Sequence, residues 1–249
     1  MTRLIRISSI AAIAFAAACS SDSSLGPSST PVDLATAFSE LQVPGISAAA
    51  SAAGGLSIPS ASSIPSGCGY VATSQNFVCP AVTSNGVTLT SSYSLLDAAG
   101  HSLTAFDAGT VASLRVKSSI NGTVAVSGDA LTIAGEQDQT LSGLQSSSHT
   151  LNGTSTLNMH GTSSTAINIQ STTTISNLVL PAHGATNQYP TSGTVAVDQV
   201  TSVSAGVSLA SRVVMTFNGT SKVGVTLTVD GHTIPGCTID LAKSTPSCG

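Results

Sequence analysis

Residues 223–229 read Val-Gly-Val-Thr-Leu-Thr-Val, an alternation of aliphatic side chains with small or hydroxyl-bearing ones. Successive side chains of a β-strand point to opposite faces, so this period of two places Val223, Val225, Leu227 and Val229 on one face and the threonines on the other. The stretch therefore predicts a strand with one buried face and one solvated face.

The same period recurs in much of the chain after residue 67. In residues 87–95, Val87, Leu89, Tyr93 and Leu95 share one face and alternate with Thr and Ser. Threonine has good β propensity and suits the solvated face of a sheet. Shorter alternations occupy residues 157–159, 167–169 and 195–197. The sequence predicts an all-β fold.

Asn-Gly and Asp-Gly dipeptides separate these stretches at a spacing that favours hairpin turns between antiparallel strands. They occupy residues 85–86, 121–122, 152–153, 218–219 and 230–231. Three of them precede Thr and so match the glycosylation acceptor pattern, but a turn accounts for each one. We expect a run of antiparallel hairpins that turn at these five positions.

The spacing of apolar residues sets the length of the loop at residues 218–219. A two-residue loop would expose either Met215 and Phe217 or the aliphatic row of residues 223–229, at a cost on the order of 5 kcal/mol, whereas turn preferences are worth about one. The loop should therefore have odd length or contain a bulge, which puts Phe217 across from Ser221. The same argument applies to the two other Asn-Gly-Thr turns.

About a dozen such strands, with almost no helix to cover them, must bury their common apolar face. A two-sheet sandwich, a closed barrel and a strongly curled half-barrel all do so. We expect residues 67–249 to form one β domain, built as an antiparallel, hairpin-rich sheet that makes a sandwich or a curled half-barrel.

Residues 19–66 are rich in Ser, Ala, Gly and Pro, which is the composition of a flexible tether. Within them, Thr30-Pro31 suits a helix start. Apolar residues then recur at helical spacing up to Pro44, at Val32, Ala35, Phe38 and Leu41. We expect a short helix over residues 31–42, which either docks its apolar stripe on the domain or forms only transiently within the tether.

Residues 1–18 have the plan of a secretory signal peptide. Arg3 and Arg6 precede an apolar run that is too short to span a bilayer, and the segment closes on Ala16-Ala17-Ala18-Cys19. This ending resembles the lipobox of bacterial lipoproteins. The resemblance implies that residues 1–18 are removed and that acylated Cys19 anchors the protein to a membrane of the bacterial cell envelope. If the envelope is Gram-negative, Ser20 after the cysteine resembles the pattern that permits export to the outer membrane. The alternative is an ordinary secretory peptide with an incidental cysteine.

The four remaining cysteines are Cys68, Cys79, Cys237 and Cys248, an even number in a compartment that permits disulfides. Short loops have the smallest closure entropy, which favours the pairs Cys68 with Cys79 and Cys237 with Cys248 among the three connectivities. A metal site built from the four thiols is the alternative, but no C-x-x-C pair or histidine spacing supports it.

The charge balance narrows the range of partners. Removal of residues 1–18 takes away two arginines and no acidic residue, which leaves five basic and eleven acidic residues and a formal charge of −6. This balance argues against nucleic acid as a partner. Ser and Thr together make up roughly three residues in ten, so the solvated surface should consist largely of hydroxyls.

The motifs of hydrolases and of metal sites are not matched. Residues 206–210 read Gly-Val-Ser-Leu-Ala, which approaches the hydrolase elbow G-x-S-x-G but ends in Ala and continues as a strand. The histidines lack metal-ligand spacing, and we expect His149 and His160 at surface positions on opposite arms of one hairpin.

The charged residues of the β region also have simple interpretations. Glu136 and Asp138 follow Gly135 without the spacing of an EF-hand, so we interpret them as a solvated turn and not as a calcium loop. Arg115 and Lys117 point to one face of a strand, which we expect to be its solvent face. We expect no metal and no cofactor.

These observations favour a non-enzymatic, lipid-anchored envelope protein whose β domain is structural or binds another envelope or extracellular macromolecule. A carrier of lipid or another apolar ligand is the alternative, because a curled sheet with one aliphatic face can enclose a ligand, as periplasmic lipoprotein carriers and lipocalin-like barrels do. A hydrolase is the second alternative, because catalytic triads are assembled in space and not in sequence. An apolar cavity above about 300 Å³ inside the sheet would favour the carrier.

Anchoring should depend on Cys19 alone. We predict that Cys19→Ser abolishes incorporation of labelled palmitate and releases the protein from membranes, because the acyl chains supply the anchoring free energy. Metabolic labelling and membrane fractionation measure the two effects. Unchanged membrane partitioning of the variant would contradict the lipobox interpretation.

Overall fold

The computed structural model describes residues 67–126, 129–161, 167–181, 189–203, 206–241 and 245–248. The predicted signal peptide 1–18, Cys19, the tether 19–66 and the helix expected over residues 31–42 lie outside the described residues. So do the residues that connect several of the strands.

The described part of the chain contains fourteen β-strands and no helix. The first seven are β1 (Gly69–Val71), β2 (Asn76–Val78), β3 (Val82–Ser84), β4 (Val87–Leu96), β5 (Ser102–Leu103), β6 (Ser113–Val126) and β7 (Asp129–Ser142). The others are β8 (Ser148–Gly161), β9 (Ile167–Pro181), β10 (Ser192–Val203), β11 (Ser208–Thr216), β12 (Lys222–Val229), β13 (His232–Asp240) and β14 (Thr245–Cys248).

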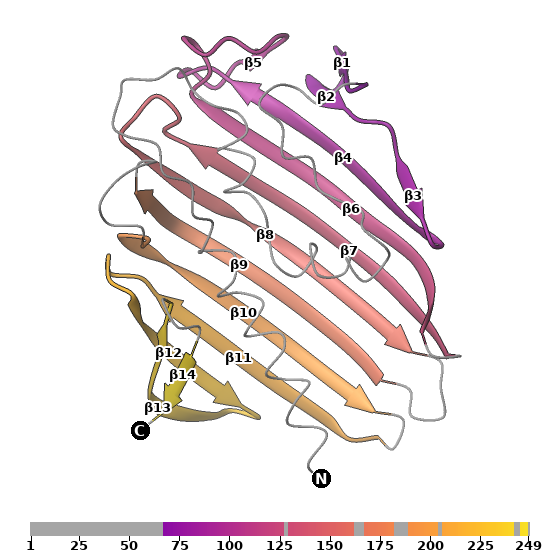
Figure 1. Ribbon diagram of the computed structural model, residues 1–249, viewed down its shortest axis with the longest axis vertical. Helices are drawn as coiled ribbons and strands as arrows, with labels where there is room; N and C mark the ends of the chain where they lie inside the picture. Colours follow the sequence, from indigo (N-terminus) through magenta and orange to yellow (C-terminus); the bar gives the residue numbers. More distant parts are fainter. Residues whose placement is uncertain are drawn as a thin grey trace.

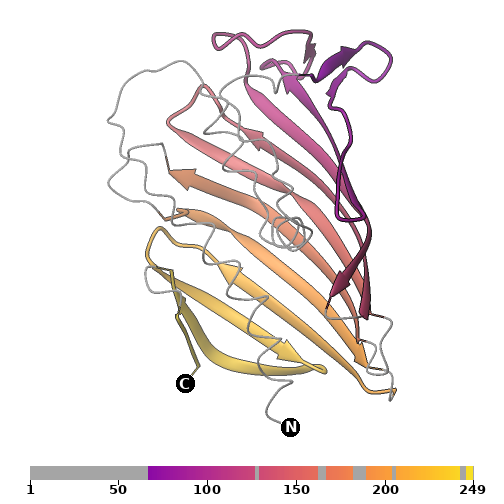
Figure 2. The ribbon, with the colours of Figure 1, turned by 45° about the vertical axis from the view of Figure 1, so that its right-hand side comes forward.

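All fourteen strands belong to one antiparallel sheet, in which strands follow one another almost in sequence order. The order is β1-β2-β4-β6-β7-β8-β9-β10-β11-β12-β13-β14, and the short strands β3 and β5 both pair with β4. Figure 1 shows this order as a progression of colour from the indigo edge to the yellow edge. The two edges stay apart when the molecule is turned (Figure 2), so the described strands form one open, twisted sheet and neither a sandwich nor a closed barrel.

One face of the sheet, here called the apolar face, carries the buried aliphatic side chains in two clusters. Both clusters lie along β4, β6 and β7, at opposite ends of these strands. The larger cluster extends to Val223 in β12 and to Leu241 after β13. It also includes Tyr93, Leu95, Leu114, Val116, Leu141, Leu151, Ile175, Val195 and Met215. The smaller cluster consists of Val87, Leu89, Ile120, Val124 and Ile133. The predicted alternation in residues 87–95 and 223–229 is confirmed, because both stretches are strands that turn their aliphatic row to this face.

The opposite face, here called the hydroxyl face, carries mainly Thr, Ser and charged side chains. Two of the predicted turns are confirmed as two-residue loops that connect strand ends, at Asn85-Gly86 between β3 and β4 and at Asp230-Gly231 between β12 and β13. All four residues have φ between 48° and 82°, which is the backbone geometry of a type I′ hairpin turn.

The connection between β11 and β12 has the predicted odd length but a different register. It spans the five residues 217–221, and Met215 pairs with Val225, so both apolar rows share the apolar face as expected. The expected pairing of Phe217 with Ser221 is wrong, because the ladder already ends at Thr216 opposite Gly224. The backbone N–H of Phe217 is instead donated to the carbonyl of Gly193 in β10, at 3.0 Å.

The turns predicted at Asn121-Gly122 and Asn152-Gly153 are wrong, because both dipeptides lie inside continuous strands of fourteen residues, β6 and β8. A Cβ atom on Gly122 would overlap the carbonyl of Gly86, and one on Gly153 would overlap the carbonyl of Asp138, so glycine permits close approach of neighbouring strands. Asn152 also has a structural role. Its Oδ1 accepts a hydrogen bond from the backbone N–H of Asn177, at 2.7 Å, where the β8–β9 register shifts.

A disulfide and three aromatic rings hold the first edge of the sheet. Cys68 and Cys79 form the disulfide predicted from the sequence, which closes the hairpin of β1 and β2. The rings of Phe77 and Tyr93 stack at 5.5 Å between centroids, and Tyr70 meets Phe77 edge-on at 5.3 Å. At the other edge Cys237 is disulfide-bonded and lies opposite Cys248 in the β13–β14 ladder, a register that agrees with the second predicted pair.

The two faces of β11 should differ in their contribution to stability. We predict that Met215→Ala lowers the free energy of unfolding by about 2–5 kcal/mol, because Met215 is buried in the larger cluster. Thr216→Ala should cost less than about 1 kcal/mol, because Thr216 is exposed on the hydroxyl face. Denaturant unfolding of both variants measures the difference. Equal losses would mean that the sheet is buried on both faces.

Candidate functional site

Polar side chains form an uninterrupted row across nine strands of the hydroxyl face. Each member lies directly opposite the next one in the ladder from β4 to β13. This hydroxyl row consists of Thr90, Ser119, Glu136, Thr156, Thr172, Asp198, Arg212, Thr228 and Thr233. Direct hydrogen bonds link some neighbours, at 2.7 Å between the hydroxyls of Thr90 and Ser119 and 3.3 Å between those of Thr228 and Thr233.

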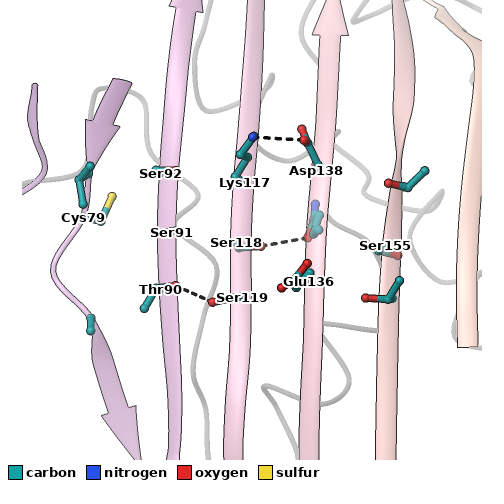
Figure 3. A pocket seen from close by; sticks show the side chains of 15 residues that line it. Cys79, Thr90, Ser91, Ser92, Lys117, Ser118, Ser119, Glu136, Asp138 and Ser155 are labelled. Atoms are coloured by element: carbon teal, nitrogen blue, oxygen red, sulfur yellow. Dashed lines mark hydrogen bonds and ion pairs between the residues drawn. The ribbon is translucent and has the colours of Figure 1, made fainter. Parts of the chain in front are cut away.

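A pocket of about 510 Å³ lies over the first four strands of this row. Its floor is the backbone at Ser91, Ser118, Gln137 and Ser155, whose side chains point to the apolar face. Two rows of side chains flank this floor, Thr90-Ser119-Glu136-Thr156 and Ser92-Lys117-Asp138-Thr154. Val78 at the end of β2, with Cys79 and Ala81 in the connection to β3, lines the pocket toward the edge of the sheet. Figure 3 shows Cys79 on this side of the pocket.

The charged groups of the pocket are largely paired with one another. Arg115, next to the pocket, donates from Nε and Nη2 to the two carboxylate oxygens of Asp138, at 2.8 and 2.6 Å. The ammonium of Lys117 lies 3.5 Å from the same carboxylate. The hydrogen bonds from Arg115 are the main cause that lowers the pKa of Asp138 and, reciprocally, raises the pKa of Arg115. Glu136 has no hydrogen-bond or ion-pair partner among the described residues, so its carboxylate is available to a ligand.

The interpretation of Glu136 and Asp138 as a turn is wrong, since both lie in the middle of β7. The alternation around them is hidden because Gln137 and Gln139, two polar residues, occupy the apolar face and are buried there. Leu131, Ile133 and Leu141 do keep the period of two across this gap. That spacing is the signal from which the strand could have been recognised. Arg115 and Lys117 are exposed on the hydroxyl face, as predicted.

The other residues considered for chemistry do not gather at this pocket. His149 and His160 lie on one strand, β8, so their placement on opposite arms of a hairpin is wrong. His101 contacts Asp97, at 3.2 Å, in the loop between β4 and β5. Ser208 begins strand β11, and its segment continues as a strand as expected.

Within the described residue ranges, no group of three or more His, Cys, Asp and Glu side chains lies close enough together to hold a metal ion. The same ranges contain no helix with the length and apolar character needed to cross a membrane.

The pocket offers the chemistry of polar recognition. Its hydroxyls both donate and accept hydrogen bonds, Glu136 accepts them and Lys117 donates them. The residues that line it include no histidine, and their cysteine, Cys79, is held in a disulfide. A Ser-His or Cys-His pair is therefore not available at its surface. Comparison with protein-family models, with curated proteins and with solved structures finds no match to this chain.

The ion pair at Asp138 should make a small contribution to stability that depends on pH. Because the folded-state pKa of Asp138 is lowered, its contribution is present above the pKa of an unfolded aspartate, about 3.9, and is lost as the pH falls through the folded-state pKa. Asp138→Asn should therefore lower the free energy of unfolding by less than about 1 kcal/mol at pH 7, since the pair is partly exposed.

Denaturant unfolding from pH 7 to pH 2 tests this dependence. The difference between the wild type and Asp138→Asn should shrink below about pH 4. Glu136→Gln on the same strand is the matched control and should change stability little at any pH, because Glu136 lacks a partner in the described structure. If the free-energy difference between the wild type and Asp138→Asn stays constant down to pH 2, the pH dependence does not come from the ion pair of Asp138.

Proposed function

We propose that this protein is a non-enzymatic, lipid-anchored component of the bacterial cell envelope whose hydroxyl face binds another macromolecule. The observation that carries the proposal is the hydroxyl row with its pocket. Nine opposed polar residues at the strand spacing of about 4.8 Å make a track roughly 38 Å long, which suits an extended partner better than a small molecule.

The charge of the hydroxyl row favours an uncharged, hydroxyl-rich polymer as the partner. Arg115 is paired with Asp138, and Arg212 donates to Asp198 at 3.0 Å, so the two arginines of the face are neutralised within the sheet. What remains is a dense array of hydroxyls, which hydrogen-bond readily to other hydroxyls. A cell-envelope or extracellular polysaccharide has this chemistry. Nucleic acid is disfavoured because a phosphate backbone needs free positive charge.

The two alternative functions have less support. A carrier of lipid or another apolar ligand calls for an apolar cavity, whereas the pocket of about 510 Å³ is lined mainly by Ser, Thr and charged residues. A hydrolase calls for a nucleophile next to a base, and the lining of the pocket offers no histidine for that role.

The anchor explains why such a face is useful. The resemblance of residues 16–19 to a lipobox supports an acylated Cys19 as the membrane anchor, and in a Gram-negative envelope we propose the outer membrane as its location. A lipid-anchored sheet that binds a polysaccharide connects the membrane to that polymer. This is a structural role and needs no catalytic group.

Binding is tested by co-sedimentation of the soluble Cys19→Ser protein with purified peptidoglycan sacculi and, separately, with insoluble cellulose as a neutral polysaccharide. We expect the protein to sediment with at least one polymer. Thr154→Ala combined with Thr156→Ala should weaken binding about tenfold, because two hydrogen bonds at the pocket are lost.

Thr123→Ala combined with Thr132→Ala is the matched control. These two threonines face each other on the hydroxyl face outside the pocket and are exposed as well. The control variant should bind as the wild type does. If the protein sediments with neither polymer, the proposed partner class is wrong. If both double variants bind normally, the pocket is not the binding site.

A further inference from the structure

The pocket on the hydroxyl face has an excess of positive charge at one end. There Arg115 and Lys117 both face the single carboxylate of Asp138, at 2.6 and 3.5 Å. Two cations against one anion leave one positive charge uncompensated. Arg115 donates to both carboxylate oxygens, whereas Lys117 makes one long contact and its side chain is half exposed. An ammonium has three N–H donors, so Lys117 keeps donors for a ligand.

Glu136 supplies a negative charge at the other end of the pocket. Its side chain is exposed, and its neighbours across the ladder are the hydroxyls of Ser119 and Thr156. Glu136 and Asp138 are two residues apart on β7, which separates the two ends of the pocket by about 7 Å along the strands. Figure 3 shows Glu136 beside Ser119 and the pair of Lys117 and Asp138 further along the strands. The pocket therefore presents a negative and a positive group separately.

This separation of charge selects among ligands. Hydrogen bonds between ionised groups are stronger than those between neutral hydroxyls, so the two ends of the pocket favour ionised partners. A ligand with charge of one sign gains at one end and is repelled at the other. A ligand that carries both an ammonium and a carboxylate gains at both ends. Such a unit has no net charge, which agrees with the uncharged polymer that the hydroxyl row favours.

The pocket also offers a small apolar surface toward the edge of the sheet. Val78, which pairs with Ser92 of β4, is 43% exposed, and Ala81 is exposed as well. Both line the pocket. Aliphatic side chains favour contact with apolar groups of a ligand, whereas the groups that a glycan presents are mainly hydroxyls. An acid, an amine and an aliphatic surface within one pocket together suit a short peptide.

We propose that the pocket binds the peptide part of peptidoglycan, with an ammonium group of the peptide at Glu136 and a carboxylate at Lys117. This inference rests on the proposed function and names its polymer. Peptidoglycan consists of hydroxyl-rich glycan strands that carry short peptides with free amines and carboxylates. The hydroxyl row beyond β8 then lies along the glycan, and the pocket over β4, β6, β7 and β8 receives a peptide that branches from it.

The contact is tested by co-sedimentation of the full chain carrying Cys19→Ser with three preparations of protein-free sacculi. One is untreated, one is acetylated with acetic anhydride so that its free amines lose their charge, and one is coupled to methylamine with a carbodiimide so that its carboxylates lose theirs. We expect each treatment to raise the dissociation constant several-fold, because it removes one charge-assisted contact. Cellulose, which has neither group, should bind more weakly than untreated sacculi.

Two substitutions assign each charge of the ligand to its residue. Glu136→Gln should bind untreated sacculi several-fold more weakly and should no longer respond to acetylation, while it still responds to coupling of the carboxylates. Lys117→Gln should show the opposite pattern. A purely structural effect of either substitution would weaken binding to all three preparations alike. If each variant responds to both treatments as strongly as the protein with Glu136 and Lys117 intact, the proposal is overturned.

Lys222→Gln is the matched control, because it removes the same charge from an exposed position of β12 on the hydroxyl face, outside the pocket. It should respond to both treatments as the protein with Lys222 does. If Lys222→Gln also loses the response to carboxylate coupling, or if treated and untreated sacculi bind equally well, the peptide assignment is overturned while binding of the polymer itself stands. If the protein sediments with neither sacculi nor cellulose, the proposed function is wrong and this inference falls with it.

Discussion

The structure depends on the antiparallel backbone ladder, because pairing assigns every side chain to one of two faces. A slip of one residue between two strands would exchange the faces of a whole strand. The pairing of Met215 with Val225 keeps two aliphatic rows on the apolar face, and the pairing of Asp198 with Arg212 keeps opposite charges together on the hydroxyl face. The clusters, the pocket and the hydroxyl row all follow from this register.

The sequence predicts the strands well where apolar residues alternate with hydroxyls, as in residues 87–95 and 223–229. It misleads where a local signal competes with the ladder. Asn-Gly strongly favours a hairpin turn in isolation, yet Asn121 and Asn152 lie within long strands, because pairing along the full length of β6 and β8 is worth more than a turn preference of about 1 kcal/mol. The apolar residues of β6 keep one parity from Leu114 to Val124, which a continuous strand explains without any turn.

The candidate site could not be predicted from the sequence for a different reason. Thr90, Lys117, Asp138 and Thr156 come from four strands, and their proximity depends on which strands are neighbours and in which register. Alternation gives the face of a residue but not its neighbour across the ladder. The buried glutamines of β7 added a further difficulty, because they interrupt the apolar pattern that would have identified the strand.

Gln137 and Gln139 also bear on how a sheet so rich in Ser and Thr keeps a single register. A strand that is polar on both faces specifies its pairing weakly. The hydrogen bond from Ser118 to Gln137 requires β6 and β7 to be aligned as they are, and a shifted register would leave more buried polar atoms without partners. The burial of these polar side chains thus has an energetic cost, and it makes the pairing of β6 with β7 more specific.

The meander order of the sheet has a consequence for how the chain folds. From β7 to β13 every strand pairs with the strand before it and the strand after it, so the contacts are short in sequence, as they are between adjacent units of a repeat protein. Loop-closure entropy is then small at each step, which favours faster folding than in β proteins with long crossover connections. A hairpin formed anywhere along this array can serve as the template for the next strand. Growth proceeds outward from it in both directions, and the terminal strands are the last to join and the first to fray.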